Sequence, residues 1–422
     1  MKMAEIKAEF EKYIVLKDKH VIEMVLASIV GNLLIDRDPL WLFIVAPSSG
    51  GKSTVVAPIV SIPLVHFVDD LTEKTFLSGY KVKGREMSLL KIIGSGILAF
   101  SDFTSILAKN PMSRGEILGQ LRLVYDGIFI KRTGTGSIEW RGKMGVIAAC
   151  TPDIYSLLES SRSAGERFIF YWMEQPTDDE IVDKQQQLKI SSKEITSIMK
   201  EMYQEYYQGV SSWIDKNDIP ELKMTDEQRQ KVRRAAIFCV NGKTTVRTDF
   251  KTGKPDAIPN KAGVGRDAKM FDTVLHTLQI MNCYEHDDSM LGVEDWMVDV
   301  VEKCAYSSIN RERRKIMEIL AAHDSPMSAS DIGACEGLGM EKDSVEKYLQ
   351  PLHSVGLVKK KMINNRFQWF VADEETRDFV EKVSGMVADQ TPAAGLEDDS
   401  TEEEDELDLL EEFYRESAKQ EE

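Results

Sequence analysis

The stretch "DPLWLFIVAPSSGGKST" (residues 38–54) decides the fold. A proline is followed by an apolar run typical of a buried strand, then by a Gly- and Ser-rich loop, and "STVVAPIV" can begin a helix. Such a loop turns backbone N–H groups toward bound phosphate. The pattern G-x-x-x-x-G-K-[ST] starts with Gly where this chain has Ala46, which is tolerable if its φ is negative. The stretch predicts a nucleotide site; a structural Gly/Ser turn is the alternative.

The loop also contains the side chains that a nucleotide triphosphate and its metal require. Lys52 is expected to reach the β- and γ-phosphates, and the Ser53 hydroxyl to hold Mg²⁺. The predicted cofactors are therefore ATP and Mg²⁺. The loop residues predicted to bind them are Ser48, Ser49, Gly50, Gly51, Lys52, Ser53 and Thr54.

Further short apolar runs indicate more strands, and amphipathic helical patterns separate most of them. Strands that alternate with helices predict a parallel, three-layer α/β sheet. After residue 176 the chain is charged and mostly helical in pattern, with a Gly/Pro/Lys-rich loop at 247–267. The additional predicted strands cover residues 63–68, 95–102, 145–150 and 167–173.

One acidic residue follows the strand predicted at 95–102. Asp102 is expected to hold the metal or to orient the attacking water, although the Glu that usually accompanies such an Asp is missing. A carboxylate that only caps the strand end is the alternative. Glu73 and Glu116 are substitutes for the missing base.

Two polar residues near the next strands complete the predicted site. Thr151 follows "GVIAAC" and is the candidate sensor of the γ-phosphate, with a strand-ending Thr-Pro turn as the alternative. Arg167 stands before the last strand, where it would reach the ATP of a neighbouring subunit and stabilise the transferring phosphoryl group. Arg162 is the second candidate, and a plain surface arginine is the alternative.

Two β-hairpins carry basic residues. "IFIKRTGTGSIEWRGK" (128–143) alternates on both sides of a Gly-Thr-Gly turn, and Lys131 and Arg132 are candidate DNA contacts. Residues 308–372 form a three-helix pattern followed by a hairpin that turns at Asn364-Asn365. This pattern predicts a winged helix, which binds either DNA or a protein. Its candidate DNA contacts are Lys359, Lys360, Lys361 and Arg366.

The motifs "DPLWLFIVAPSSGGKST", "LTEKTFLSGY", "DFTSIL…EILGQLRLVYDG", "GTGSIEWRGKMGVIAACTPD" and "GERF" resemble AAA+ ATPases of bacteriophages and related mobile elements. These proteins are described as phage ATPases or replicative helicases, and more distantly resemble minichromosome-maintenance and small viral hexameric helicases. The resemblance covers residues 10–175. It implies the roles given above for Lys52, Ser53, Asp102, Thr151 and Arg167. It also implies a helical lid with an arginine that contacts the γ-phosphate, for which Arg266 is the candidate, and a channel-lining hairpin at 128–143.

Composition limits the remaining possibilities. The chain has 422 residues and a formal net charge of −17. Residues 396–422 contain fourteen acidic residues against Arg415 and Lys419, a net of −12, so the rest of the chain carries −5. That mild charge leaves room for local basic patches. The five scattered cysteines are typical of reduced thiols in a cytosol. No apolar run is long enough to span a bilayer, and the first residues lack a secretory pattern.

The expected protein is an ATP-hydrolysing motor in the cytoplasm of a bacterial host cell, assembled as a homo-oligomeric, hexameric ring on DNA. The acidic C-terminal tail would contact a replication protein or remain a disordered, solvating segment. One alternative is an ATP-dependent switch that does not translocate, such as an initiator, helicase loader or regulator. A second alternative is that ATP only holds a structural assembly together. The expected division is N-terminal helices at 1–34, an AAA+ core at 35–176, a helical lid at 177–307, a winged helix at 308–372, and a helix and acidic tail at 373–422.

Overall fold

The structure is a computed structural model. It describes residues 1–18, 20–48, 50–78, 81–83, 85–133, 136–159, 167–244 and 263–387. Ser49, Arg162, most of the predicted loop at 247–267 and the acidic tail lie outside these residues.

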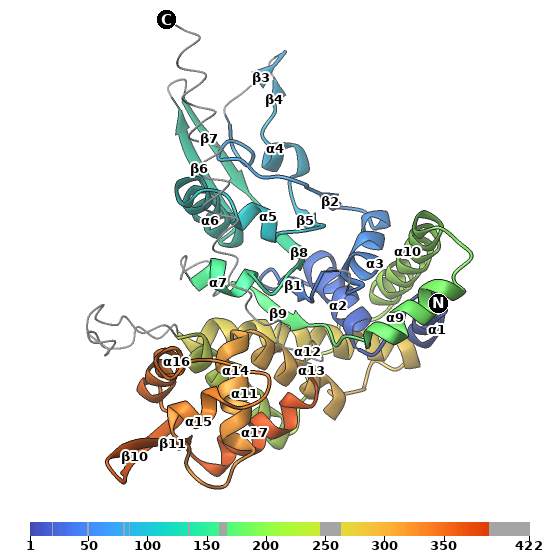
Figure 1. The fold of residues 1–422 in the computed structure, drawn as a ribbon. Helices are drawn as coiled ribbons and strands as arrows, with labels where there is room; N and C mark the ends of the chain where they lie inside the picture. Colours follow the sequence, from blue (N-terminus) through green and yellow to red (C-terminus); the bar gives the residue numbers. More distant parts are fainter. Residues whose placement is uncertain are drawn as a thin grey trace, which may run out of the picture.

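The centre of the molecule is a five-stranded parallel sheet (Figure 1). Its strand order is β2-β5-β8-β1-β9, so β8 lies between β1 and β5. The predicted strands are all present, because each is a short, mainly apolar run bounded by turn residues. Their bounds are β1 (Trp41–Val45), β2 (Val65–Phe67), β5 (Gly96–Phe100), β8 (Met144–Cys150) and β9 (Ile169–Trp172).

Successive side chains of each strand enter two different cores, since side chains alternate across a sheet. In β1, Leu42 and Ile44 belong to one core, and Trp41, Phe43 and Val45 belong to the other. Both faces of the sheet are therefore covered, which confirms the predicted three-layer α/β arrangement.

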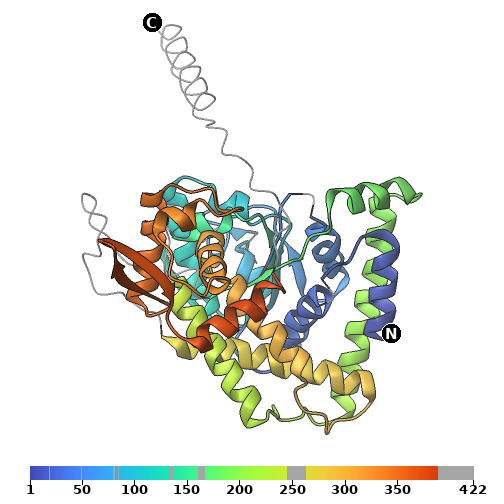
Figure 2. The same ribbon diagram turned by 60° about the horizontal axis from the view of Figure 1, so that its bottom comes forward.

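The first core joins the N-terminal helices to the helices that follow the sheet. Nearly all of α2 is buried, and it packs against β8, β5 and α12. α1 packs against α10, far along the chain (Figure 2). The elements on this side are α1 (Met3–Tyr13), α2 (Val21–Leu33), α3 (Lys52–Val56), the 3₁₀ helix η1 (Ala57–Ser61), α10 (Ser192–Lys216), α12 (Val264–His286) and α13 (Asp295–Ser307).

The second core lies between the other face of the sheet and a set of shorter elements. Phe129 and Trp140 anchor the base of the β6–β7 hairpin in this core. The elements are α4 (Leu89–Ile93), α5 (Thr104–Leu107), α6 (Pro111–Tyr125), β6 (Ile128–Thr133), β7 (Gly136–Arg141) and α7 (Ile154–Glu159). β3 (Lys81–Val82) and β4 (Arg85–Glu86) pair with each other as a separate two-stranded sheet.

The region after the sheet is helical, as expected. Capping boxes at Thr177, Ser191 and Thr225 begin three of its helices, because each cap hydroxyl accepts from the third helical N–H. The loop predicted to end at residue 267 is too long, since α12 already begins at Val264. The remaining helices here are α9 (Asp178–Gln187) and α11 (Asp226–Lys243).

The last described segment contains three helices, an antiparallel hairpin and a final helix. Ile316, Ile319 and Leu320 of α14 are buried, as their spacing predicts. Met327 pairs with Trp369, which draws the segment before α15 onto the hairpin. The bounds are α14 (Arg311–Ala321), α15 (Ala329–Gly333), α16 (Lys342–Ser354), β10 (Val358–Ile363), β11 (Arg366–Val371) and α17 (Glu374–Ser384). In the described part of the chain, no helix combines the length and apolar character that crossing a membrane requires.

Candidate nucleotide site

The predicted phosphate loop follows β1 at the carboxyl edge of the sheet. Ala46 is buried and still belongs to the strand ladder, because its N–H donates to the Cys150 carbonyl at 3.2 Å. Its φ is not positive, so Ala replaces Gly here without backbone strain. Gly51 does need to be glycine, since its φ of +77° lies in the left-handed region. The loop thus turns at Gly51, directly before α3.

Lys52 folds back over this loop. Its Nζ donates to the carbonyls of Ala46 at 2.7 Å and Pro47 at 2.6 Å. Burial lowers the pKa of the Lys52 amino group, while the fields of Cys150 and Asp102 act to raise it. The ammonium therefore sits beside the loop with Asp102 in electrostatic reach.

The loop also presents backbone donors. Within the described part of the chain, the N–H groups of Gly51, Lys52 and Ser53 donate to no protein acceptor. Donors of this kind, next to a lysine ammonium, fit an anion such as a phosphate. The residues present therefore match the phosphate groups of ATP, and the Ser53 side chain is exposed where a metal ion would accompany them.

Gln175 is a neighbour of the loop that sequence reasoning missed. It is buried just beyond the end of β9, and its Nε2 donates to the Met173 carbonyl at 2.8 Å. A Cβ at Gly50 would lie 2.2 Å from Gln175 Oε1 and 3.0 Å from the Pro47 carbonyl oxygen. Gly50 thus lets the loop pack against Gln175. The only signal in the sequence is that Gln175 follows a strand, and β9 turns out to be the neighbour of β1.

Asp102 and Thr151 follow the ends of β5 and β8. Thr104 joins these two ends, because its Oγ1 accepts from the Thr151 N–H at 3.1 Å and its own N–H donates to Asp102 Oδ1 at 2.9 Å. The Thr151 hydroxyl donates to Asp153 at 2.8 Å. Asp102 is exposed. The carboxyl edge of the sheet thus brings Lys52, Asp102 and Thr151 to one place.

Arg167 and Arg266 lie elsewhere. Arg167 precedes β9 and is buried at the amino edge of the sheet, opposite to Lys52. Its Nη2 donates to Asp126 Oδ1 at 3.3 Å, and its guanidinium lies over the Tyr125 ring. Burial raises the pKa of Tyr125 to about 12, as does the field of Asp38, while Arg266 and Arg167 oppose the increase. Arg167 therefore contacts Tyr125, and Arg266 lies within electrostatic reach of it.

No contact among the described residues holds Glu73 or Glu116, the two candidate substitute bases, near Lys52. Glu73 accepts from the Ser113 hydroxyl at 2.7 Å, and its carbonyl accepts from Gln120, so it is held against α6. Glu116 is exposed on α6.

The basic hairpin residues differ in exposure. Arg132 is exposed on β6 and Lys131 is half-buried. Lys143, expected near the same hairpin, points inward and donates to the carbonyls of Gly31 and Ile35. On β10, Lys359 donates to the Ala372 carbonyl. Lys361 on β10 and Arg366 on β11 are exposed. Figure 1 shows the two hairpins at distant ends of the molecule.

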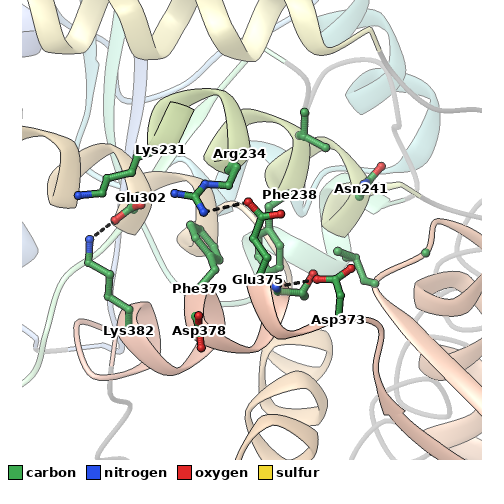
Figure 3. A pocket seen from close by; sticks show the side chains of 14 residues that line it. Lys231, Arg234, Phe238, Asn241, Glu302, Asp373, Glu375, Asp378, Phe379 and Lys382 are labelled. Atoms are coloured by element: carbon green, nitrogen blue, oxygen red, sulfur yellow. Dashed lines mark hydrogen bonds and ion pairs between the residues drawn. The ribbon is translucent and has the colours of Figure 1, made fainter. Parts of the chain in front are cut away.

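A pocket of about 450 Å³ lies away from the phosphate loop, between α11 and α17 (Figure 3). Arg234 pairs with Glu375 across it at 2.9 Å, and Lys382 pairs with Glu302. Phe238 and Phe379 contact each other, with ring centroids 4.5 Å apart. Ion pairs and a ring contact thus join α11, α13 and α17 around the pocket, which is a seam between helices.

Neither the known family models nor the curated proteins give a match to this chain. Among the described residues, no group of three or more His, Cys, Asp or Glu side chains is assembled that could hold a metal ion. The chemistry of the site is therefore inferred from its geometry.

Proposed function

We propose that the chain is an AAA+ ATPase that hydrolyses ATP with Mg²⁺ and acts on DNA as a replicative helicase or translocase of a bacteriophage or mobile element. The observation that carries the proposal is the meeting of Lys52, Asp102 and Thr151 at one edge of the parallel sheet. Ligands of such sheets bind outside the carboxyl ends of the strands. The apolar strand, the left-handed Gly51 and the loop N–H groups that donate to no acceptor among the described residues support ATP as the ligand.

Each residue has a defined part in this proposal. Lys52 leaves the carbonyls of Ala46 and Pro47 to bind the β- and γ-phosphates. Ser53 and Asp102 hold Mg²⁺, which would neutralise charge on the phosphates. Thr151 senses the γ-phosphate, and for this its hydroxyl must exchange Asp153 for the new partner. Ser48, Gly50 and Thr54 complete the loop around the phosphates.

Arg167 and Arg266 would act on a neighbouring subunit. A strand rises about 3.3 Å per residue, so the length of β9 separates Arg167 from the carboxyl edge of its own sheet. A guanidinium at the amino edge can serve an ATP only in another copy of the chain. This supports a homo-oligomer, a hexameric ring in the proposal, in which hydrolysis depends on assembly.

The action on DNA rests on the basic hairpins. Lys131 and Arg132 on the β6–β7 hairpin would bind phosphates in a ring channel. The helices α14, α15 and α16 with the β10–β11 hairpin would form a winged helix that adds a second DNA contact. We also propose the cytoplasm of the bacterial host as the site of action, and a replication protein as the partner of the acidic tail.

The ATPase rate with and without single-stranded DNA, combined with strand displacement on a forked duplex, tests this function. Both activities should be lost in Lys52→Ala and in Lys52→Met, which keeps the aliphatic stem but not the charge. Lys193→Ala, at an exposed lysine in the first turn of α10, is the matched control and should keep both.

The outcome decides between the proposal and its alternative. ATP hydrolysis that DNA does not stimulate, with no strand displacement, would point instead to a non-translocating switch such as an initiator, loader or regulator. A wild-type chain that binds no nucleotide would overturn both.

A further inference from the structure

The tip of the β10–β11 hairpin has a defined geometry. Asn364 and Asn365 have φ values of +49° and +57°, which give a tight two-residue turn. The turn fixes the cross-strand pairs Ile363–Arg366 and Met362–Phe367. The side chains at the tip are therefore held in register.

Exposed apolar side chains flank the Asn364-Asn365 turn, where solvent-exposed positions are usually polar. Met362 is 57% exposed and Phe367 is 49% exposed, and both lie on the face that includes the buried Trp369. The face of the hairpin that is buried at Trp369 therefore continues past the core and is exposed to solvent at the tip. Because burial of an aromatic side chain is stabilising, the half-exposed Phe367 contributes less to the stability of the fold than a buried ring would.

Three cations lie near this apolar tip: Lys360 shares the face of Phe367, and Lys361 and Arg366 extend from the opposite face. The Lys360 Nζ lies 4.9 Å from the centroid of the Phe367 ring and 5.1 Å from that of Trp369. Lys361 and Arg366 are exposed and form no ion pair with the acidic residues of the described chain. The positive charge at the tip is thus available to an external anion.

An exposed ring and thioether flanked by cations match one ligand chemistry especially well. Unpaired nucleobases stack on aromatic rings, and the phosphates that link them bind Lys and Arg. The backbone of an intact duplex would use the cations but not Phe367 or Met362. We infer that the tip of this hairpin holds unpaired bases of a nucleic acid where double strand gives way to single strand. This inference rests on the proposed action on DNA.

The role of each residue follows from its position. Phe367 stacks on the first unpaired base, and Met362 packs beside it. Lys361 and Arg366 extend from the opposite face of the hairpin and bind phosphates of the strand that passes around the tip. Lys360 keeps its charge over the face of the Phe367 ring. The β6–β7 hairpin lies at the other end of the molecule (Figure 1). The two hairpins would therefore contact DNA at separate places and with different roles.

Binding of the full chain to forked DNA and to blunt duplex, both without ATP, tests the inference. Phe367→Ala should weaken fork binding about tenfold and leave duplex binding within about twofold. Phe367→Trp should retain fork binding. Lys361→Ala should weaken both and lower their salt dependence. Met290→Ala, an exposed methionine before α13, is the matched control and should change neither.

A fluorescent adenine analogue placed at the first unpaired base gives a second readout. Its emission should be quenched by the wild-type chain and by Phe367→Trp, but not by Phe367→Ala. Equal effects of Phe367→Ala on fork and duplex, or no effect on either, would overturn the inference. So would binding to anionic lipid vesicles that requires Phe367 while fork binding does not.

The acidic segment at 396–422 is the competing occupant within the chain. Removing residues 388–422 should leave the tenfold effect of Phe367→Ala on fork binding intact. If the effect disappears in the shortened chain, the tail is the ligand and the inference is wrong. The proposed function is judged separately, by the ATPase rate of the wild-type chain. A wild-type chain that hydrolyses no ATP would contradict the proposed function and not the contact at the hairpin tip.

Discussion

At the scale of single residues, Lys143 looks ordinary in the sequence but lies in an unusual environment in the structure. The sequence places it beside a basic hairpin, yet its amino group binds the carbonyls of Gly31 and Ile35 inside the protein. Burial lowers the pKa of this group to about 8, although the fields of Asp36 and Asp38 act to raise it. Protonation of Lys143 therefore destabilises the folded state relative to the unfolded chain.

The sign of the pH dependence follows from this shift. An unfolded lysine has a pKa of about 10.4, so between about pH 8 and pH 10 the unfolded chain binds more protons at this site than the folded chain. The free energy of unfolding of the wild type should rise with pH relative to Lys143→Met. The rise should be about 1 kcal/mol per pH unit, reduced from the ideal value because the group is partly solvated.

Urea unfolding of both chains at about pH 7, 8.5 and 9.5 measures the difference, and stopping there avoids the ionisation of tyrosines. The same substitution at Lys91, an exposed lysine of α4, is the control and should give no pH-dependent difference. A flat difference between wild type and Lys143→Met would show that Lys143 is solvated in the folded chain.

At the scale of secondary-structure elements, Arg314 connects four of them. It is buried on α14, and its guanidinium lies near three aromatic rings, at 4.6 Å from Trp172 of β9, 5.7 Å from Tyr155 of α7 and 5.8 Å from Tyr306 of α13. Ser307 adds backbone bonds to the same junction, because its hydroxyl accepts from the Trp172 N–H and its carbonyl accepts from Tyr155. The helices after the sheet are thereby fixed to the sheet itself.

Arg314→Leu should lower the free energy of unfolding by about 2 kcal/mol, because it removes the cation from a desolvated aromatic cage. Arg314→Lys should not restore the loss, since a lysine has no planar group to stack on the rings. Urea unfolding followed by tryptophan fluorescence measures both. Lys315→Ala, at a half-buried lysine of α14, is the control and should stay within about 0.5 kcal/mol. Full stability of Arg314→Lys would mean that charge alone matters here.

The sequence predicted elements better than it predicted contacts. The strands are correct because each is a short apolar run with turn residues at both ends, and the capped helices carry local signals at Thr177, Ser191 and Ser328. The ion pair of Asp18 with Lys303 has no such signal, since 285 positions separate its members. The residues that contact Gly50 and Arg167 could not be predicted for the same reason. They depend on which strands become adjacent, and local patterns do not encode this.

At the scale of the whole molecule, the two edges of the sheet have different chemistry. The carboxyl edge holds the phosphate loop with Asp102 and Thr151, and the amino edge holds Arg167 and Arg266 around Tyr125. One copy of the chain cannot bring these sets together, because the strands hold them apart. Two copies placed with unlike edges in contact can, and a ring repeats this contact at every interface.

Mixing two inactive variants tests this arrangement. Lys52→Ala subunits keep Arg167 but lack a working site, and Arg167→Ala subunits keep the site but lack the arginine. In a random mixture, about a quarter of the interfaces pair an intact Lys52 with an intact Arg167, so hydrolysis should recover to about that fraction of the wild-type rate. Because Arg167 is buried against Asp126, a structural defect is the competing explanation, and it would give no recovery on mixing. The same experiment with Arg266→Ala tests whether the second arginine acts across the same interface. Particle size, measured in parallel, verifies that the mixed subunits assemble.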